Sequence, residues 1–229
     1  MIDQYVQVIK VLEPEEVEKI LTYFDEDVEF KRSEVHFENN KSKKDSSRTS
    51  YTGGFKEDDA DILKLLDNRV YEAVKDYLNR LSNSTHPQLG PNYHLAGNFI
   101  NHQRPLSLRE NYSLLKYRKG DQYLPHTDVA DEPGQILTYR QVSMVLYLNG
   151  DFEGGSTAFF HTAVKPSPGY AVFFPSNNCF VHSGTPVQRG TKKVIVTWFH
   201  HPLTKECLKN TNPECDEFVD LFDSSTNEE

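Results

Sequence analysis

The chain has 229 residues and a formal net charge of −9, because 34 acidic residues outnumber 25 basic ones. That balance works against broad binding to a nucleic-acid backbone, which needs a positive field. Hydrophobic residues make up 37% and aromatic residues 12% of the chain, which is too apolar for disorder. No apolar run approaches the roughly 20 residues of a membrane span. We therefore expect one globular domain over residues 1–229, with no nucleic-acid and no membrane partner.

The N-terminus and the cysteines bear on the compartment. The first ten residues have neither a basic start nor a long apolar stretch, so they do not resemble a secretory signal and favour the cytoplasm. Cys179, Cys207 and Cys215 form an odd set without a Cys-x-x-Cys spacing, which favours reduced thiols. Pairing of Cys207 with Cys215 stays open. For Cys179 we expect a buried position, as a small hydrophobic side chain.

The N-terminal half predicts two helices. Residues 6–11 are typical of a short edge strand, and Pro14 with the following glutamates is typical of a helix start. A longer apolar pattern with helical spacing covers residues 59–81. Between the helices, residues 31–56 are polar and basic without periodicity, and we predict a mobile loop there.

After residue 110 the sequence becomes rich in strand-forming residues, punctuated by Gly, Pro and Asn. The predicted strands cover 93–100, 112–117, 141–148, 157–160, 170–174 and 193–199. Many short strands with helices gathered at one end predict an α+β fold, a double-stranded β-helix (jelly roll) backed by N-terminal helices. Within it we expect a helical support and loop region at 1–109, a jelly-roll core at 110–203 and a C-terminal tail at 204–229.

One triplet carries the chemistry. His126 and Asp128 are two positions apart, so on a strand both face the same side. A second histidine from another strand would complete the 2-His-1-carboxylate set that leaves open positions on Fe(II), and His182 is the candidate. Lys192, ten residues further on, would need an anion if it were buried near a metal. Considered alone, it is better explained as an ordinary lysine at a strand edge.

Several further motifs occur in a fixed order around these residues. They are Tyr117, Gly120 and Tyr123 before His126; Arg140, Ser143, Tyr147 and Leu148; Gly154, Gly155, Thr157 and Phe159; Gly184, Pro186, Val187 and Gly190 between His182 and Lys192; Trp198; and, upstream, Arg48, Thr49, Ser50 and Phe55. In this order they resemble the motifs of the Fe(II)- and 2-oxoglutarate-dependent dioxygenases, specifically the prolyl 4-hydroxylase family. The resemblance is tight from about residue 110 to 200 and loose before it.

The resemblance implies a role for each residue. His126, Asp128 and His182 would bind Fe(II), and Lys192 would pair with the C5 carboxylate of 2-oxoglutarate, helped by Tyr117 and Thr157. A further set of residues, at the positions where the family holds the substrate proline, consists of Tyr123, Arg140 and Trp198. For Tyr123 and Trp198 a purely structural place in the core stays open. Fe(II), 2-oxoglutarate, O2 and ascorbate are the implied cofactors and cosubstrates.

The sequence thus predicts a 2-oxoglutarate-dependent dioxygenase similar to procollagen-proline 4-dioxygenase, acting on a proline-containing peptide or protein. Two alternatives stay open. The same chemistry could act on lysyl or asparaginyl residues, a free amino acid or a nucleobase, or the chain could be a non-catalytic jelly-roll binding module. An intact triad together with Lys192 argues against the binding module, which has no use for three metal ligands.

Overall fold

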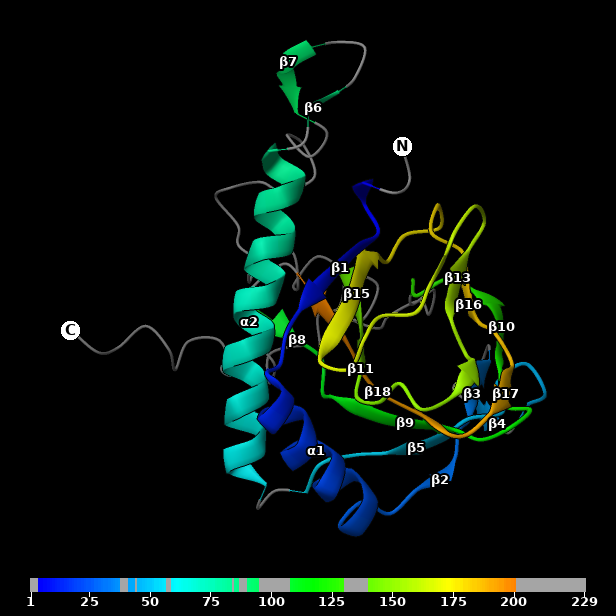
Figure 1. The fold of residues 1–229 in the computed structure, drawn as a ribbon. Helices are drawn as coiled ribbons and strands as arrows, with labels where there is room; N and C mark the ends of the chain where they lie inside the picture. The colour runs from blue at the N-terminus through cyan, green and yellow to red at the C-terminus, as the bar shows by residue number, and fades with distance from the viewer. Residues whose placement is uncertain are drawn as a thin grey trace, which may run out of the picture.

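In the computed structural model, two β-sheets face each other and two helices cover the outer face of the larger sheet (Figure 1). The structure describes residues 4–37, 41–43, 45–56, 59–83, 85–86, 90–94, 108–129 and 140–200. Among these residues, no helix combines the length and apolar character that a bilayer crossing requires. The α+β jelly roll that the sequence predicts is the fold observed.

The major sheet is antiparallel, and its strands run in the order β1-β15-β11-β18-β9-β5-β2, with β8 also paired to β18. In chain order these strands are β1 (Gln7–Lys10), β2 (Lys31–Arg32), β5 (Tyr51–Gly53), β8 (Leu108–Arg109), β9 (Ser113–Tyr117), β11 (Arg140–Tyr147), β15 (Tyr170–Pro175) and β18 (Lys192–His200). As predicted, the strand near the N-terminus lies at an edge, where it pairs with β15.

The minor sheet holds four strands in the order β10-β16-β13-β14. They are β10 (Tyr123–His126), β13 (Thr157–Phe159), β14 (Ala163–Val164) and β16 (His182–Gly184). Three two-stranded pairs complete the β structure: β12 (Glu153–Gly154) with β17 (Val187–Arg189), β3 (Val35–Phe37) with β4 (Lys41–Lys43), and β6 (Thr85–His86) with β7 (Gly90–His94).

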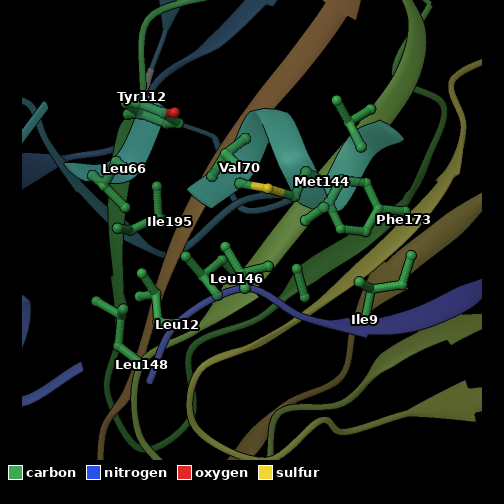
Figure 2. Close-up of a cluster of buried hydrophobic side chains, with 14 of the residues drawn as sticks. Ile9, Leu12, Leu66, Val70, Tyr112, Met144, Leu146, Leu148, Phe173 and Ile195 are labelled. Atoms are coloured by element: carbon green, nitrogen blue, oxygen red, sulfur yellow. The ribbon is translucent and has the colours of Figure 1, made fainter. Parts of the chain in front are cut away.

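Two helices pack on one face of the major sheet, as the sequence predicts. Helix α1 (Pro14–Glu26) begins with a proline, and the Glu16 carboxylate accepts a 2.9 Å hydrogen bond from the Glu13 backbone N–H that precedes the helix. Helix α2 (Ala60–Asn83) presents Leu66 and Val70 to the sheet, where they meet Met144, Leu146 and Ile195 (Figure 2). Burying each such side chain contributes about 1.5–3 kcal/mol.

Strand alternation divides the core in two. Along β15, Ala171 and Phe173 belong to the cluster that contacts the helices, whereas Val172 and Phe174 belong to the cluster between the two sheets. Tyr117, Tyr147 and Val194 also face the space between the sheets. That inner face is where polar groups from both sheets converge.

The predicted mobile loop at 31–56 is wrong as a description of the backbone. Strands β2 and β5 extend the major sheet through β5 pairing with β9, and Ser33 and Ser50 are buried and hydrogen-bonded to each other at 2.8 Å. Strands at or next to a sheet edge are held by backbone hydrogen bonds, so they can form without an alternating apolar pattern. The region before residue 110 thus contributes β1, β2, β5 and β8 to the major sheet.

The expected burial of Cys179 is also wrong. Its thiol is exposed, on the turn between β15 and β16, where its backbone N–H donates a 3.0 Å hydrogen bond to the Asn177 side chain. A turn that satisfies its own backbone groups leaves the side chain toward solvent. The strand predicted at 93–100 corresponds to β7 as far as His94. Its remaining residues, the tail at 204–229 and both other cysteines lie outside the described residues.

Candidate active site

His126, Asp128 and His182 lie together between the sheets, with one potential ligand atom from each residue within 4.8 Å of the others. The His126 Nε2 atom is 3.7 Å from Asp128 Oδ1, and the His182 Nε2 atom is 3.5 Å from Asp128 Oδ2. Among the described residues, this is the one cluster of three or more His, Cys, Asp or Glu side chains with the spacing of a metal site.

The strand register explains this convergence. Strands β10 and β16 are antiparallel neighbours in which His126 is directly opposite His182, so both rings leave the sheet on the same side. Asp128 follows His126 by two residues and returns to that side. A register shift between Tyr123 and His126 adjusts the end of β10 next to the cluster.

Both histidine rings are oriented by backbone carbonyls. The Nδ1 atom of His126 is 2.8 Å from the Leu124 carbonyl, and Nδ1 of His182 is 3.1 Å from the Phe180 carbonyl. Donation from Nδ1–H leaves the Nε2 lone pair of each ring directed at Asp128, as a metal ligand requires. Burial, followed by the nearby His182, lowers the pKa of His126 to about 4, so its ring is neutral at physiological pH.

Asp128 is buried and held as an anion. Its Oδ2 atom accepts a 2.7 Å hydrogen bond from the Ser143 hydroxyl, which is 2.8 Å from the Ser176 hydroxyl. Burial pushes the pKa of Asp128 upward, but the two histidines and Ser143 outweigh it, and the net direction is downward. Ser143 was part of a motif, but the sequence assigned it no role. Nothing in the sequence pointed to Ser176.

Lys192, on β18 of the major sheet, faces the space between the two sheets and has only 3% of its surface exposed. Its Nζ atom is 5.1 Å from the centre of the Tyr117 ring and 4.8 Å from that of Tyr147. No carboxylate or other hydrogen-bond acceptor among the described residues contacts this ammonium group. Burial, followed by the charge of Lys165, lowers the pKa of Lys192 to about 7. A buried cation of this kind is stabilised when an anion binds beside it.

Two tyrosines flank this lysine. Tyr117 is buried and is its directly opposed neighbour across β9 and β18, and the Tyr147 hydroxyl is 2.8 Å from the Thr157 hydroxyl. The structure thus places Tyr117 beside Lys192 and links Thr157 to it through Tyr147. Tyr147, named only as part of a motif, joins them. On the next position of β18, Lys193 points the other way and pairs with Asp25 of α1 at 2.6 Å.

Gly155 lets the backbone approach the lysine closely. Its φ angle is +64°, and an added Cβ would lie 3.2 Å from Lys192 Cδ and 3.0 Å from the Phe152 ring. A side chain at this position would be strained by the backbone conformation and would press on the lysine stem.

Tyr123 lies against the histidines. Its ring stacks on His126, with ring centres 3.6 Å apart and an interplanar angle of 19°. The Arg48 guanidinium lies 5.0 Å from the centre of the Tyr123 ring, and Arg48 also forms an isolated β-bridge with Tyr123. The upstream segment that the sequence matched only loosely thus borders the site.

Arg140 and Trp198 lie beside Asp128. The Arg140 guanidinium stacks on the Trp198 ring at 3.8 Å and donates a 3.3 Å hydrogen bond to the Asp128 carbonyl. Its other nitrogens bind the Glu110 carboxylate, with Nη2 at 2.7 Å, so Arg140 is not a free cation. Glu110 gave no sequence signal. The Trp198 side chain also acts on Asp128 and helps to lower the pKa of that carboxyl.

The donor set fits Fe(II) and 2-oxoglutarate on chemical grounds. Two imidazoles and one carboxylate are the ligand set that binds Fe(II) on one side and leaves positions for exogenous ligands. A buried lysine without an acceptor among the described residues, flanked by Tyr117 and Tyr147, suits the distant carboxylate of a dicarboxylate such as 2-oxoglutarate.

Comparison with known proteins agrees with this chemistry. Residues 112–200 match the model of the 2OG-Fe(II) oxygenase superfamily, so this part of the chain is a 2OG-Fe(II) oxygenase domain. Membership of that superfamily implies Fe(II) and 2-oxoglutarate. Human Prolyl 3-hydroxylase 1 is 34% identical over 98 residues, a match that covers 36% of this chain and 13% of that protein. Prolyl 4-hydroxylase 13 of Arabidopsis thaliana is 28% identical over 120 residues, covering 41% of this chain and 44% of that protein.

The structural comparison extends over most of the chain. A prolyl hydroxylase from Trichoplax adhaerens, solved with a peptide of the hypoxia-inducible factor oxygen degradation domain, matches with a TM-score of 0.58 and 16% identity, covering 86% of this chain and 84% of the other. At that identity the similarity shows the fold. Since the chain spans less than half the length of these two curated relatives, their activities and substrates enter only as proposals.

Proposed function

We propose that the protein is an Fe(II)- and 2-oxoglutarate-dependent dioxygenase that hydroxylates prolyl residues in a peptide or protein. The observation that carries the proposal is the position of Lys192, a buried lysine without an anionic partner among the described residues, in the same space between the sheets as a His-Asp-His cluster. The His-Asp-His cluster suits a metal ion, and the buried lysine suits a carboxylate. A 2-oxo acid with a second, distant carboxylate satisfies both.

The strand geometry connects the two groups. Phe159 of β13 is directly opposite His182, and Thr157 lies two residues earlier on the same side of that strand. Two residues of strand span about 7 Å. Thr157 contacts Tyr147, whose ring faces Lys192, so the hydroxyl pair lies between the cluster and the lysine. This separation suits a short dicarboxylate that reaches from the metal to the ammonium group.

In this proposal His126, Asp128 and His182 hold Fe(II) through two Nε2 atoms and a carboxylate oxygen, while Lys192, Tyr117, Tyr147 and Thr157 hold the C5 carboxylate of 2-oxoglutarate. When bound, Fe(II) with O2 and 2-oxoglutarate supplies an oxidative decarboxylation that is coupled to hydroxylation of a substrate C–H bond and yields succinate and CO2. The chain contributes orientation. The backbone carbonyls fix the imidazole rings, Ser143 fixes Asp128, and the buried walls exclude water.

A prolyl substrate is supported by the names of the relatives and by the residues that border the triad. Tyr123, Trp198 and the stacked Arg140 form an aromatic and hydrogen-bonding wall next to His126 and Asp128. A proline ring is apolar and compact, and its backbone carbonyl accepts a hydrogen bond. The curated relatives are named as 3- and 4-hydroxylases, and we propose C4 as the position of hydroxylation. The ascorbate requirement and cytoplasmic location predicted from the sequence are retained as proposals.

The test is a panel of peptides that differ only in the central residue, which is proline, lysine or asparagine, with free proline as a fourth substrate. Purified protein is supplied with Fe(II), 2-oxoglutarate and ascorbate, succinate is quantified, and each product is analysed by mass spectrometry and NMR. The proposal expects succinate and 4-hydroxyproline in equal amounts from the proline peptide alone. Preference for the lysine or asparagine peptide would contradict the substrate, and absence of succinate with every member of the panel would contradict the reaction.

A further inference from the structure

The ion pair between Glu110 and Arg140 lies beside the metal cluster and is largely buried, with 16% and 17% of the two side chains exposed. The guanidinium offers Nε and Nη2 to the two oxygens of the carboxylate in a fork, and Nη1 to the Asp128 carbonyl. Such bidentate pairs fix the plane and position of the arginine. The side chain that the site presents is therefore a hydrogen-bond donor whose charge is already balanced.

The backbone of Glu110 is held by two adjacent residues of β18, Thr197 and Trp198. Its backbone N–H donates a 2.9 Å hydrogen bond to the Trp198 carbonyl, and its carbonyl accepts a 2.7 Å hydrogen bond from the Thr197 hydroxyl. The preceding residue, Arg109, is anchored to Asp67 of α2 at 2.8 Å. With its backbone held in this way, the carboxylate of Glu110 determines where the guanidinium lies on the Trp198 ring.

A guanidinium has five N–H bonds, so the contacts to Glu110 and Asp128 leave donors that can meet a substrate oxygen. A neutral carbonyl can accept from such a donor. A carboxylate brought to the same place meets the Glu110 carboxylate at short range in a partly buried site, where like charges repel strongly. Discrimination of this kind depends on an element that is unfavourable for the wrong ligand.

We propose that Glu110 is a specificity-determining residue, which makes Arg140 select a neutral backbone carbonyl and disfavours a substrate that presents a free carboxylate there. The site then takes an internal residue of a polypeptide and rejects a free amino acid or a C-terminal residue. This inference rests on the proposed function and narrows its substrate class.

Two peptides of identical sequence, each ending in the target proline, test it. One ends in a carboxamide and the other in a free carboxylate, so they differ by one charge next to the reacting ring. Steady-state rates are measured for the wild-type protein, Glu110→Gln, Glu110→Asp and Glu153→Gln. Glu153 is the matched control, because it also pairs with an arginine, Arg189, but lies in an exposed pair away from the cluster.

The wild-type protein is expected to prefer the carboxamide. Glu110→Gln is expected to shift the ratio of kcat/KM for the two peptides toward the carboxylate by roughly tenfold, mainly through KM. A hydrogen bond to a charged group contributes a free energy that corresponds to a change of about this size. Glu110→Asp keeps the charge and retains the preference, which distinguishes a charge effect from a packing effect. Glu153→Gln behaves as the wild type.

An equal fall of kcat/KM for both peptides in Glu110→Gln, with the ratio unchanged, would overturn the inference and leave Glu110 a structural residue. A wild-type preference for the carboxylate peptide would overturn it as well. Failure of the proposed function is distinguishable, because the wild-type protein would then form succinate with neither peptide nor with a longer peptide that carries an internal proline.

Discussion

Lys192 and Tyr117 are directly opposite each other across β18 and β9, and the lysine ammonium lies 5.1 Å from the centre of the tyrosine ring inside the jelly roll. The ring and its neighbour Tyr147 give the cation partial compensation, but they supply no negative charge. Burial therefore disfavours the charged form of this amine in the ligand-free protein, and a bound anion is expected to supply the counterion that the ammonium form lacks.

Replacement of Lys192 should weaken 2-oxoglutarate binding while leaving the metal cluster intact. Breaking a buried ion pair by removing one partner costs about 3–5 kcal/mol, so Lys192→Ala should raise the dissociation constant by a factor on the order of hundreds or more. Lys192→Arg should bind 2-oxoglutarate more tightly than Lys192→Ala but less tightly than the wild type, because the planar guanidinium needs a different geometry from the ammonium group. Titration of 2-oxoglutarate into metal-loaded protein measures this.

The adjacent Lys193 is the control for that experiment. It faces α1 and forms a surface pair with Asp25, which is worth at most about 1 kcal/mol, so Lys193→Ala should leave the dissociation constant for 2-oxoglutarate nearly unchanged. A silent Lys192→Ala combined with a damaging Lys193→Ala would contradict the assignment of the cosubstrate anchor.

The depressed pKa of Lys192 predicts a pH dependence with a defined sign. In the ligand-free protein the pKa of Lys192 is about 7, against the ordinary value of 10.5 for a lysine, so between these values the unfolded chain binds more protons at this position than the folded one. Raising the pH through this window should therefore stabilise the ligand-free fold, by up to about 1.4 kcal/mol per pH unit from this group. Lys192→Met should lose that component in thermal unfolding measured from pH 7 upward.

Protonation of Lys192 should be coupled to 2-oxoglutarate binding, so that the ligand-free protein takes up a proton when it binds the ligand. Because the C5 carboxylate requires the ammonium form, affinity should fall by up to about tenfold per pH unit above the free-state pKa. Calorimetric titration in buffers of different ionisation enthalpy, with a redox-inert divalent metal bound, should reveal proton uptake at pH 8 and little at pH 6. Equal proton uptake at both pH values would contradict a neutral Lys192 in the ligand-free state.

Gly155 provides an independent probe of the lysine pocket. Gly155→Ala places a Cβ at 3.2 Å from the lysine stem in a left-handed backbone conformation that costs about 1–2 kcal/mol for a non-glycine residue. It should lower the melting temperature and raise the dissociation constant for 2-oxoglutarate. Gly54→Ala is the matched control, since a Cβ at Gly54 meets no described atom within 4 Å. Tight 2-oxoglutarate binding by Gly155→Ala would argue against the close approach of residue 155 to the Lys192 side chain.

Ser143 should tune the metal site through Asp128. Ser143→Ala removes the 2.7 Å hydrogen bond to Asp128 Oδ2, and loss of such an outer partner typically weakens metal affinity by about 10–100-fold. Competition titration against a metal chelator measures the change without any turnover. Ser176→Ala, which contacts Ser143 and not the carboxylate, should have a smaller effect. Equal effects of the two substitutions would point to general loosening of the core.

The sequence predicted that His126, Asp128 and His182 converge, because this prediction needs only a local rule. Residues two positions apart on a strand face the same side, which places His126 and Asp128 together. The sequence could not predict that Glu110 would bind Arg140, 30 positions away, or that Ser176 would support Ser143, since such contacts depend on how distant strands align. Strands β2 and β5 were missed because the backbone pairing of β2 with β5 and of β5 with β9 holds them without an apolar pattern.

The central claim is that the chain couples 2-oxoglutarate decarboxylation to hydroxylation of a prolyl peptide through the His126–Asp128–His182 cluster. The most direct measurement uses ¹⁸O2 with Fe(II), 2-oxoglutarate and the proline peptide, followed by mass spectrometry of both products. The account predicts one labelled oxygen in succinate and one in hydroxyproline, in equal amounts, and loss of both products together with bound iron in His182→Ala. Unlabelled hydroxyproline, or labelled products from His182→Ala at the wild-type rate, would contradict it.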